Sequence, residues 1–120
     1  MSILFIEYPT CSTCKKAKKF LKDQGCSLQE RHIVTQTPTK EELTRWHKES
    51  NLPLKRFFNT SGNLYKEMNL KEKLPTMSED EQLTLLSQHG MLIKRPLVIS
   101  KDYIFVGFKE ENYEKLCPEC

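Results

Sequence analysis

The chain has 120 residues, 38% of them hydrophobic and 29% charged, and its net charge at pH 7 is +3. This composition suits one globular domain with a single hydrophobic core and excludes wholesale disorder. No apolar stretch approaches the roughly 20 residues that a membrane-spanning helix needs, and the apolar N-terminal run lacks the length and basic start of a signal peptide. We therefore expect a cytoplasmic protein whose thiols are kept reduced.

The first part of the chain predicts a strand, a helix and a second strand. Residues 3–8 are apolar, with β-branched and aromatic side chains, and the run stops at Pro9. Residues 12–24 carry apolar side chains at helical spacing, with Gly25 as the expected C-terminal cap. Residues 27–34 alternate partly between apolar and polar, as in a strand. This order predicts a βαβ unit with parallel strands and a right-handed crossover.

The middle of the chain, about residues 36–91, is predicted to be helical. Thr39 and Glu42 have the spacing of a capping box, in which the side chains at the helix start and three residues later exchange hydrogen bonds with the backbone. Ser78 and Glu81 repeat this spacing at a second helix start.

The last part predicts two strands over residues 95–100 and 103–107, joined by a hairpin turn at 101–102, and a final helix over 110–116. Without the helical block, a βαβ unit followed by ββα remains. The sequence therefore predicts an α/β fold with a thioredoxin-like core and a helical insertion between its second and third strands, all within one domain over 1–120.

Cys11 and Cys14 lie two residues apart at the predicted junction of the first strand and helix. A helix N-terminus carries unpaired N–H groups and a partial positive charge, which stabilise a thiolate. We expect Cys11 to be the more exposed thiol and the nucleophile. Cys14, one turn further on, is expected to be the resolving thiol. The backbone N–H groups of Ser12 and Thr13 are candidates for binding an anion at this point.

Two other interpretations of this pair stay open. The two thiols can be small packed side chains, or they can form a four-thiolate zinc site with Cys117 and Cys120, although nearly the whole chain separates the two pairs. The C-terminal pair by itself is either a second dithiol or an incidental feature. Cys26 is expected to be a packed residue, and the odd total of five cysteines does not indicate a disulfide framework.

A basic cluster follows the two cysteines and consists of Lys15, Lys16, Lys18 and Lys19. It is interpreted either as a solvated helix face or as an electropositive surround for the thiolate. Binding to nucleic acid is not expected, because the cluster is short and has no interleaved aromatic residues. The sequence contains no Gly-rich phosphate loop, so we expect no bound organic cofactor.

Arg95 and Pro96 open the third predicted strand. In thioredoxin-like folds the proline at this place is usually cis and lies opposite the active cysteine. Arg95 would then bring a fixed positive charge with several donors to the thiolate. The alternative is an ordinary proline at a strand edge beside a surface arginine.

Four segments in this order resemble the ArsC/Spx family: YPTCSTCKKA (8–17), FFNTSG (57–62), LIKRPLVI (92–99) and VGF (106–108). The resemblance covers nearly all 120 residues. It implies a thioredoxin-like fold with a helical insertion. The family contains glutaredoxin-coupled arsenate reductases and Spx-type redox regulators of RNA polymerase.

The resemblance also implies roles for particular residues. Cys11 matches the nucleophile of the arsenate reductases, and Arg95 matches one of the three arginines in their anion site. The other two positions fall at Asn59 and at about Phe108 in this chain. By this match Asn59 and Pro96 are expected to contact the anion beside Cys11. The Spx-type members share the paired cysteines and the Arg-Pro, which implies a Cys11–Cys14 disulfide.

Three functional hypotheses follow. In the first, the protein is a thiol-dependent oxidoreductase whose Cys11 attacks an oxyanion such as arsenate, or a disulfide. Arg95, Lys15 and neighbouring groups stabilise the anion, Cys14 resolves the adduct, and glutaredoxin with glutathione, or thioredoxin, restores the thiols. In the second, the Cys11–Cys14 disulfide is the signal of a redox switch that binds a partner such as RNA polymerase. In the third, the protein is a zinc-bound structural or adaptor protein.

Overall fold

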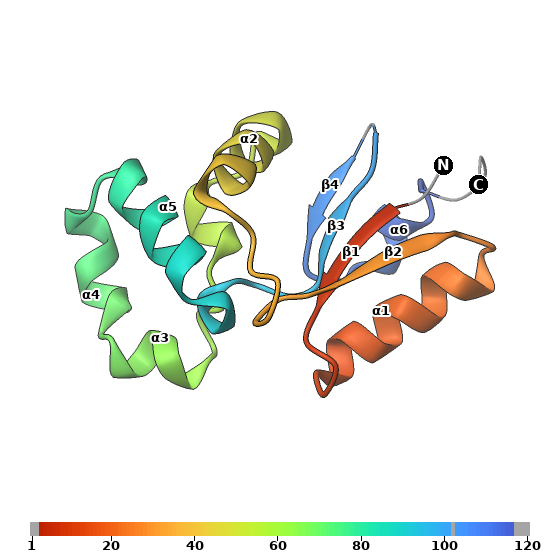
Figure 1. Cartoon of the computed structure of the whole chain (residues 1–120), viewed down its shortest axis with the longest axis horizontal. Coiled ribbons are helices and arrows are strands. Elements are labelled where there is room, and N and C mark those ends of the chain that lie inside the picture. The colour runs from red at the N-terminus through yellow and green to blue at the C-terminus, as the bar shows by residue number, and fades with distance from the viewer. Residues whose placement is uncertain (1–2, 102, 117–120) are drawn as a thin grey trace. The chain divides into compact units, whose positions relative to one another are not determined.

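The structure of the chain is a computed structural model, which describes residues 3–101 and 103–116 (Figure 1). The chain divides into two compact units. One is discontinuous, running up to His32 and resuming at Arg95, and the other is the continuous segment Ile33–Lys94. The expected helical insertion at 36–91 falls within this second unit.

The discontinuous unit is built on a four-stranded sheet with the order β2-β1-β3-β4. Its elements in chain order are β1 (Ile3–Glu7), α1 (Ser12–Asp23), β2 (Leu28–His32), β3 (Leu97–Ile99), β4 (Ile104–Val106) and α6 (Glu110–Tyr113). β1 pairs parallel to β2 and antiparallel to β3, and β3 pairs antiparallel to β4. The α/β order predicted from the sequence, βαβ and then ββα, is confirmed.

The helix α1 ends where the sequence places a glycine. The backbone of Gly25 has a φ of +87°, and its N–H donates to the carbonyl of Lys22 at 3.0 Å. The N–H of Cys26 donates to the carbonyl of Leu21, also at 3.0 Å. These two bonds satisfy carbonyl groups that the last helical turn leaves open, and the left-handed conformation between them favours glycine.

The core of this unit lies between the sheet, α1 and the C-terminal segment. Its buried members are Ile3, Phe5, Ala17, Leu21, Cys26, Val98, Tyr113 and Leu116. The hydroxyl of Tyr113 donates to the carbonyl of Gly107 at 2.8 Å, which ties the last helix to the end of β4. Cys26 is buried as expected, but it is disulfide-bonded and not a free thiol, a state that the cysteine count did not indicate.

The continuous unit is helical, as predicted. Its elements are α2 (Lys40–Ser50), η1 (Leu54–Phe57), α3 (Asn63–Glu67), α4 (Leu70–Lys73), η2 (Leu74–Thr76), α5 (Glu79–Gln88) and η3 (Gly90–Leu92), where η marks a 3-10 helix. Both predicted capping boxes are present, at Thr39 with Glu42 and at Ser78 with Glu81. None of the helices in the described parts of the chain is long and apolar enough to cross a membrane.

Gly90 has a steric role in this helical unit. A Cβ at this position would lie 2.1 Å from the carbonyl oxygen of Ile33 and 2.9 Å from its carbonyl carbon. Both atoms belong to the backbone, so they cannot move aside as a flexible side chain can. The close approach of two backbone segments therefore requires glycine here.

We expect Gly90→Ala to lower the free energy of unfolding by about 1–3 kcal/mol, the usual cost of forcing extra atoms into a packed region. Gly62→Ala is the matched control, because the nearest atom to its added Cβ is Nδ2 of the Asn59 side chain, at 2.7 Å. That side chain can rotate away at a smaller cost. Urea denaturation followed by circular dichroism measures both changes, and an equal or larger loss in Gly62→Ala would contradict the steric explanation.

Candidate active site

Cys11 lies at the junction of the β1 segment with α1, as its N-terminal cap residue. Its backbone is extended, with φ −75° and ψ 120°. The N–H of Cys11 donates to the carbonyl of Tyr8 at 2.9 Å, and its carbonyl accepts from the N–H of Lys15 at 3.1 Å. A tight turn and the first helical hydrogen bond therefore hold Cys11 at the start of the helix, where the sequence placed it.

Cys14 lies in the first turn of α1 and faces the core. It shares the buried face of the helix with Ala17 and Leu21, and it has no exposed surface. Cys11 is only partly buried. The expected difference in exposure between the two thiols is therefore confirmed, and it follows from the position of one cysteine before the helix and of the other on its inner face.

The environments of the two thiols move their pKa values in opposite directions. Burial raises the pKa of Cys11, but the backbone and thiol of Cys14 and the guanidinium of Arg95 together bring it below the ordinary 9.0. Burial raises the pKa of Cys14 to about 12, helped by the neighbouring Cys11 and opposed by the backbone of Tyr8 and by Arg95. When one of the two thiols is ionised, it is thus Cys11.

Arg95 interacts directly with the Cys11 sulfur, which is one of the two arrangements that the sequence left open for Arg95 and Pro96. The Arg95–Pro96 peptide bond is cis, and Pro96 is buried. The carbonyl of Pro96 accepts from the N–H of Gly107 at 2.9 Å, which fixes this backbone against the end of β4. The guanidinium is therefore attached to a segment that the sheet holds in place.

Tyr8 is a residue of this site that the sequence analysis did not single out. The Cζ atom of Arg95 lies over the Tyr8 ring, 5.4 Å from the ring centroid, which is within the range of a cation–π interaction. The Tyr8 ring also packs edge to face with the His32 ring, with centroids 5.7 Å apart and ring planes at 81°. No local pattern could have identified Tyr8, because its partner is 87 positions away in the chain.

The register of the sheet explains this contact. β1 and β3 pair antiparallel with Ile6 opposite Leu97, and each further step along one strand is a step back along the other. Tyr8 lies two residues after Ile6 and Arg95 two residues before Leu97, so both lie just beyond the same end of this strand pair. The same pairing that builds the sheet therefore brings Tyr8 and Arg95 together.

Ser12 and Thr13 are the first two residues of α1, and both side chains are exposed. N–H groups in the first helical turn have no partner within the helix, so they can donate to an anion bound beside Cys11. Their role in binding stays a prediction. Lys15 is exposed on the same helix, and its role in stabilising an anion stays a prediction.

Two of the four lysines in the basic cluster after Cys14, Lys18 and Lys19, form ion pairs. The ammonium group of Lys18 lies 2.7 Å from a carboxylate oxygen of the buried Glu7, and it also pairs with Glu30. Lys19 pairs with Asp23 one turn further on, at 3.1 Å. The pKa of Lys18 is raised, first by Glu30 and then by Glu7. This pattern favours the interpretation as a charged, solvated helix face.

The two positions that match the family's other arginines have different surroundings. Phe108 packs against Tyr113 with ring centroids 4.9 Å apart, so its side chain belongs to the core of the sheet unit. Asn59 belongs to the helical unit, where its backbone N–H donates to the carbonyl of Leu92 at 2.7 Å. A role of Asn59 in binding an anion stays a prediction.

The zinc hypothesis is not tested by the structure. The described residues contain no group of three or more His, Cys, Asp or Glu side chains that could hold a metal ion. Cys117 and Cys120, the other half of the predicted four-thiolate site, lie outside the described residues.

Comparison with known proteins identifies related structures and sequences. A crystal structure of an ArsC family related protein from Bacteroides fragilis is 53% identical, covers 97% of this chain and 98% of that one, and superposes with a TM-score of 0.93. The crystal structure of a possible arsenate reductase from Streptococcus mutans UA159 is 42% identical, covers 89% of this chain and 91% of that one, and has a TM-score of 0.83.

Two proteins of Bacillus subtilis (strain 168) are similar in sequence. The uncharacterized protein YusI is 56% identical over 96% of this chain and 98% of its own length. The regulatory protein MgsR is 29% identical over 95% of this chain and 89% of its own length. The model of the ArsC family matches residues 6–116. With its thioredoxin-like arrangement of strands and helices and this nearly complete match, the chain belongs to the ArsC family.

Proposed function

We propose that this protein is a thiol-dependent oxidoreductase in which Cys11 is the nucleophile and Cys14 is the resolving thiol. The observation that carries the proposal is the placement of two neighbouring thiols at the start of α1, with Cys11 partly exposed beside Arg95 and Cys14 buried. In these surroundings the pKa of Cys11 is lowered and that of Cys14 is raised. A thiolate is the reactive form of cysteine, so the lowered pKa favours attack by Cys11 near neutral pH. Arg95 beside the sulfur is suited to hold an anionic substrate.

Arsenate is the oxyanion substrate that the family relationship favours. The Cys11 thiolate attacks arsenic(V) and displaces one oxygen, which takes up protons and leaves as water. A Cys11–arsenic bond forms in this step, and the oxidation state of arsenic does not change. The Arg95 guanidinium, and the N–H groups of Ser12 and Thr13, would donate to the remaining oxygens of the adduct.

Cys14 completes the reduction. Its thiol gives its proton to an oxygen of the adduct, and its sulfur attacks the sulfur of Cys11. The sulfur–arsenic bond breaks, its electron pair stays on arsenic, and arsenite leaves while the Cys11–Cys14 disulfide forms. Once Cys11 is bonded to arsenic it is no longer an anion, so one cause of the high pKa of Cys14 disappears at the step that needs its thiolate.

An external dithiol must then return two electrons to the Cys11–Cys14 disulfide. Glutaredoxin with glutathione, or thioredoxin, supplies this chemistry by thiol–disulfide exchange, in which an incoming thiolate attacks one sulfur of the pair. The partly exposed Cys11 sulfur is the accessible one. The cytoplasm, where such donors keep protein thiols reduced, is the compartment that fits this cycle. A disulfide substrate would follow the same steps, with a mixed disulfide in place of the arsenic adduct.

A redox switch is the second candidate function. It uses the same disulfide as a signal to a protein partner such as RNA polymerase, in place of turnover. The relationship to the regulatory protein MgsR over most of both chains favours this candidate. Both functions require Cys11 and Cys14 to form a reversible disulfide. They differ in whether a small substrate is consumed.

The ionisation of Cys11 is expected to depend on Arg95. In the native protein, the rate of alkylation of Cys11 by iodoacetamide should reach half of its plateau at a pH below 9.0, because the pKa is lowered. Arg95→Leu removes a positive charge that stabilises the thiolate, so the midpoint should move to higher pH. Peptide mapping by mass spectrometry separates Cys11 from the other cysteines. An unchanged midpoint in Arg95→Leu would contradict the assigned role of this arginine.

Tyr8 is expected to act on the same ionisation through Arg95. Tyr8→Leu removes the ring face under the guanidinium, so Arg95 should lie over Cys11 for less of the time and the alkylation midpoint should rise. Tyr8→Phe keeps the ring and is the matched control, with a midpoint close to that of the native protein. Equal shifts in both variants would assign the effect to the hydroxyl group and not to the ring.

Turnover separates the two candidate functions. Arsenate-dependent consumption of NADPH is measured in reactions coupled either to glutathione and glutaredoxin or to thioredoxin. We expect turnover with one of these donors, complete loss in Cys11→Ser, and a glutathione-dependent remainder in Cys14→Ser. Full activity of Cys11→Ser would refute the enzymatic proposal. No turnover in the native protein, together with reversible formation of the Cys11–Cys14 disulfide, would favour the redox switch.

A further inference from the structure

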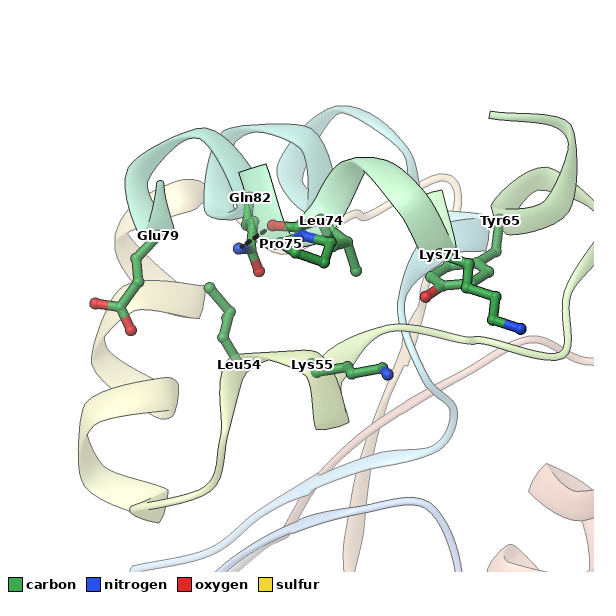
Figure 2. Close-up of a pocket in the computed structure, with 8 residues that line it drawn as sticks. All are labelled: Leu54, Lys55, Tyr65, Lys71, Leu74, Pro75, Glu79 and Gln82. Carbon is green, nitrogen blue, oxygen red and sulfur yellow. Dashed lines mark hydrogen bonds between the residues drawn. The ribbon is translucent and has the colours of Figure 1, made fainter. Parts of the chain in front are cut away.

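The helical unit contains two adjoining cavities that the thiol chemistry does not use. The first has a volume of about 280 Å³ and is lined by residues of η1, α3, α4, η2 and α5 (Figure 2). The second, of about 260 Å³, lies against α3 and α4. Tyr65 and Lys71 line both, so the two cavities adjoin along these side chains.

One wall of the first cavity is apolar and held in place. Leu54, Tyr65 and Leu74 are each at most 7% exposed, so the structure around them fixes their position. The Tyr65 ring packs edge-on against Phe58, with centroids 6.4 Å apart. The side-chain amide of Gln82 donates to the carbonyl of Leu74 at 3.3 Å, a bond that Figure 2 draws across the cavity wall. The cavity is therefore formed before any ligand arrives.

Another part of the lining is cationic. Lys55 and Lys71 line the first cavity, and Lys66 joins Lys71 in the second. Figure 2 shows Lys71 beside Tyr65 at one end of the cavity and Lys55 along its lower side, with its side chain directed toward that end, while Glu79 lies at the far end. Within the described residues, no carboxylate forms an ion pair with any of these three lysines. The lysine side chains thus give one end of the partly apolar cavity a positive charge.

We propose that the helical unit binds a small amphipathic anion, a single-ring organic phosphate or carboxylate, in the first cavity. The ring would lie against Leu54, Leu74 and Tyr65, and the anionic group would lie between the ammonium groups of Lys55 and Lys71. A cavity of about 280 Å³ is just below the usual range for drug-sized ligands, which favours one ring over a dinucleotide or a longer chain. The site consists of residues of this unit alone and does not depend on the proposed redox function.

Phenyl phosphate is the probe, because it joins one apolar ring to one phosphate. It is titrated into the full-length chain labelled with ¹⁵N, and amide shifts are followed by NMR. We expect saturable shifts at the amides around Leu54, Tyr65, Lys71 and Leu74. Inorganic phosphate, which lacks the ring, and phenol, which lacks the charge, should both bind more weakly. Shifts confined to the amides around Cys11 would assign the anion to the redox site and overturn the proposal.

Lys71→Gln should weaken binding of phenyl phosphate about tenfold, since it removes one charge-assisted contact. Lys73→Gln is the matched control: it lies on the same helix and changes the net charge equally, but it lines neither cavity. Its affinity should stay within about twofold of that of the native chain. Equal losses in the two variants, or shifts that do not saturate, would show non-specific attraction and overturn the proposal.

Discussion

The antiparallel pairing of β1 with β3 is the constraint on which the candidate site depends. It places Leu97 opposite Ile6, so Tyr8 and Arg95 lie just beyond the same end of this strand pair. The Arg95 guanidinium then reaches both the Tyr8 ring and the Cys11 sulfur. The hydrogen bond between Gly107 and Pro96 holds the same segment from the other side. The Arg95 charge is thus held beside the Cys11 sulfur by the segment that leads directly into β3.

The different roles of the two cysteines follow from helix geometry. A residue three positions after the cap turns inward with the first helical turn, so Cys14 joins the buried face of α1. The cap residue itself lies before the helix, where N–H groups and Arg95 can reach its sulfur. Burial keeps one thiol protonated, and nearby donors favour ionisation of the other. One spacing of two residues therefore yields one partly exposed thiol with a lowered pKa and one buried thiol with a raised pKa.

The basic residues of the chain fall into groups with different physical roles. On α1, Lys18 and Lys19 are neutralised by carboxylates, so they contribute to a solvated surface. Arg95 is fixed beside a thiol and an aromatic ring, where its charge changes the chemistry of a neighbour. In the helical unit, Lys55, Lys66 and Lys71 form no ion pair with a carboxylate among the described residues, and they line the two cavities. The net charge of +3 does not distinguish these groups, because it counts every basic residue equally.

The sequence alone determined the features whose atoms are close in the chain. The capping boxes at Thr39 and Ser78, the glycine end of α1 and the position of Cys11 at a helix start depend on contacts within about four residues, so local patterns predict them. Only the tertiary structure decided which distant residues meet. The contact of Tyr8 with Arg95, the disulfide-bonded state of Cys26 and the cavity beside Tyr65 depend on strand register and packing between elements, which no short segment of the chain encodes.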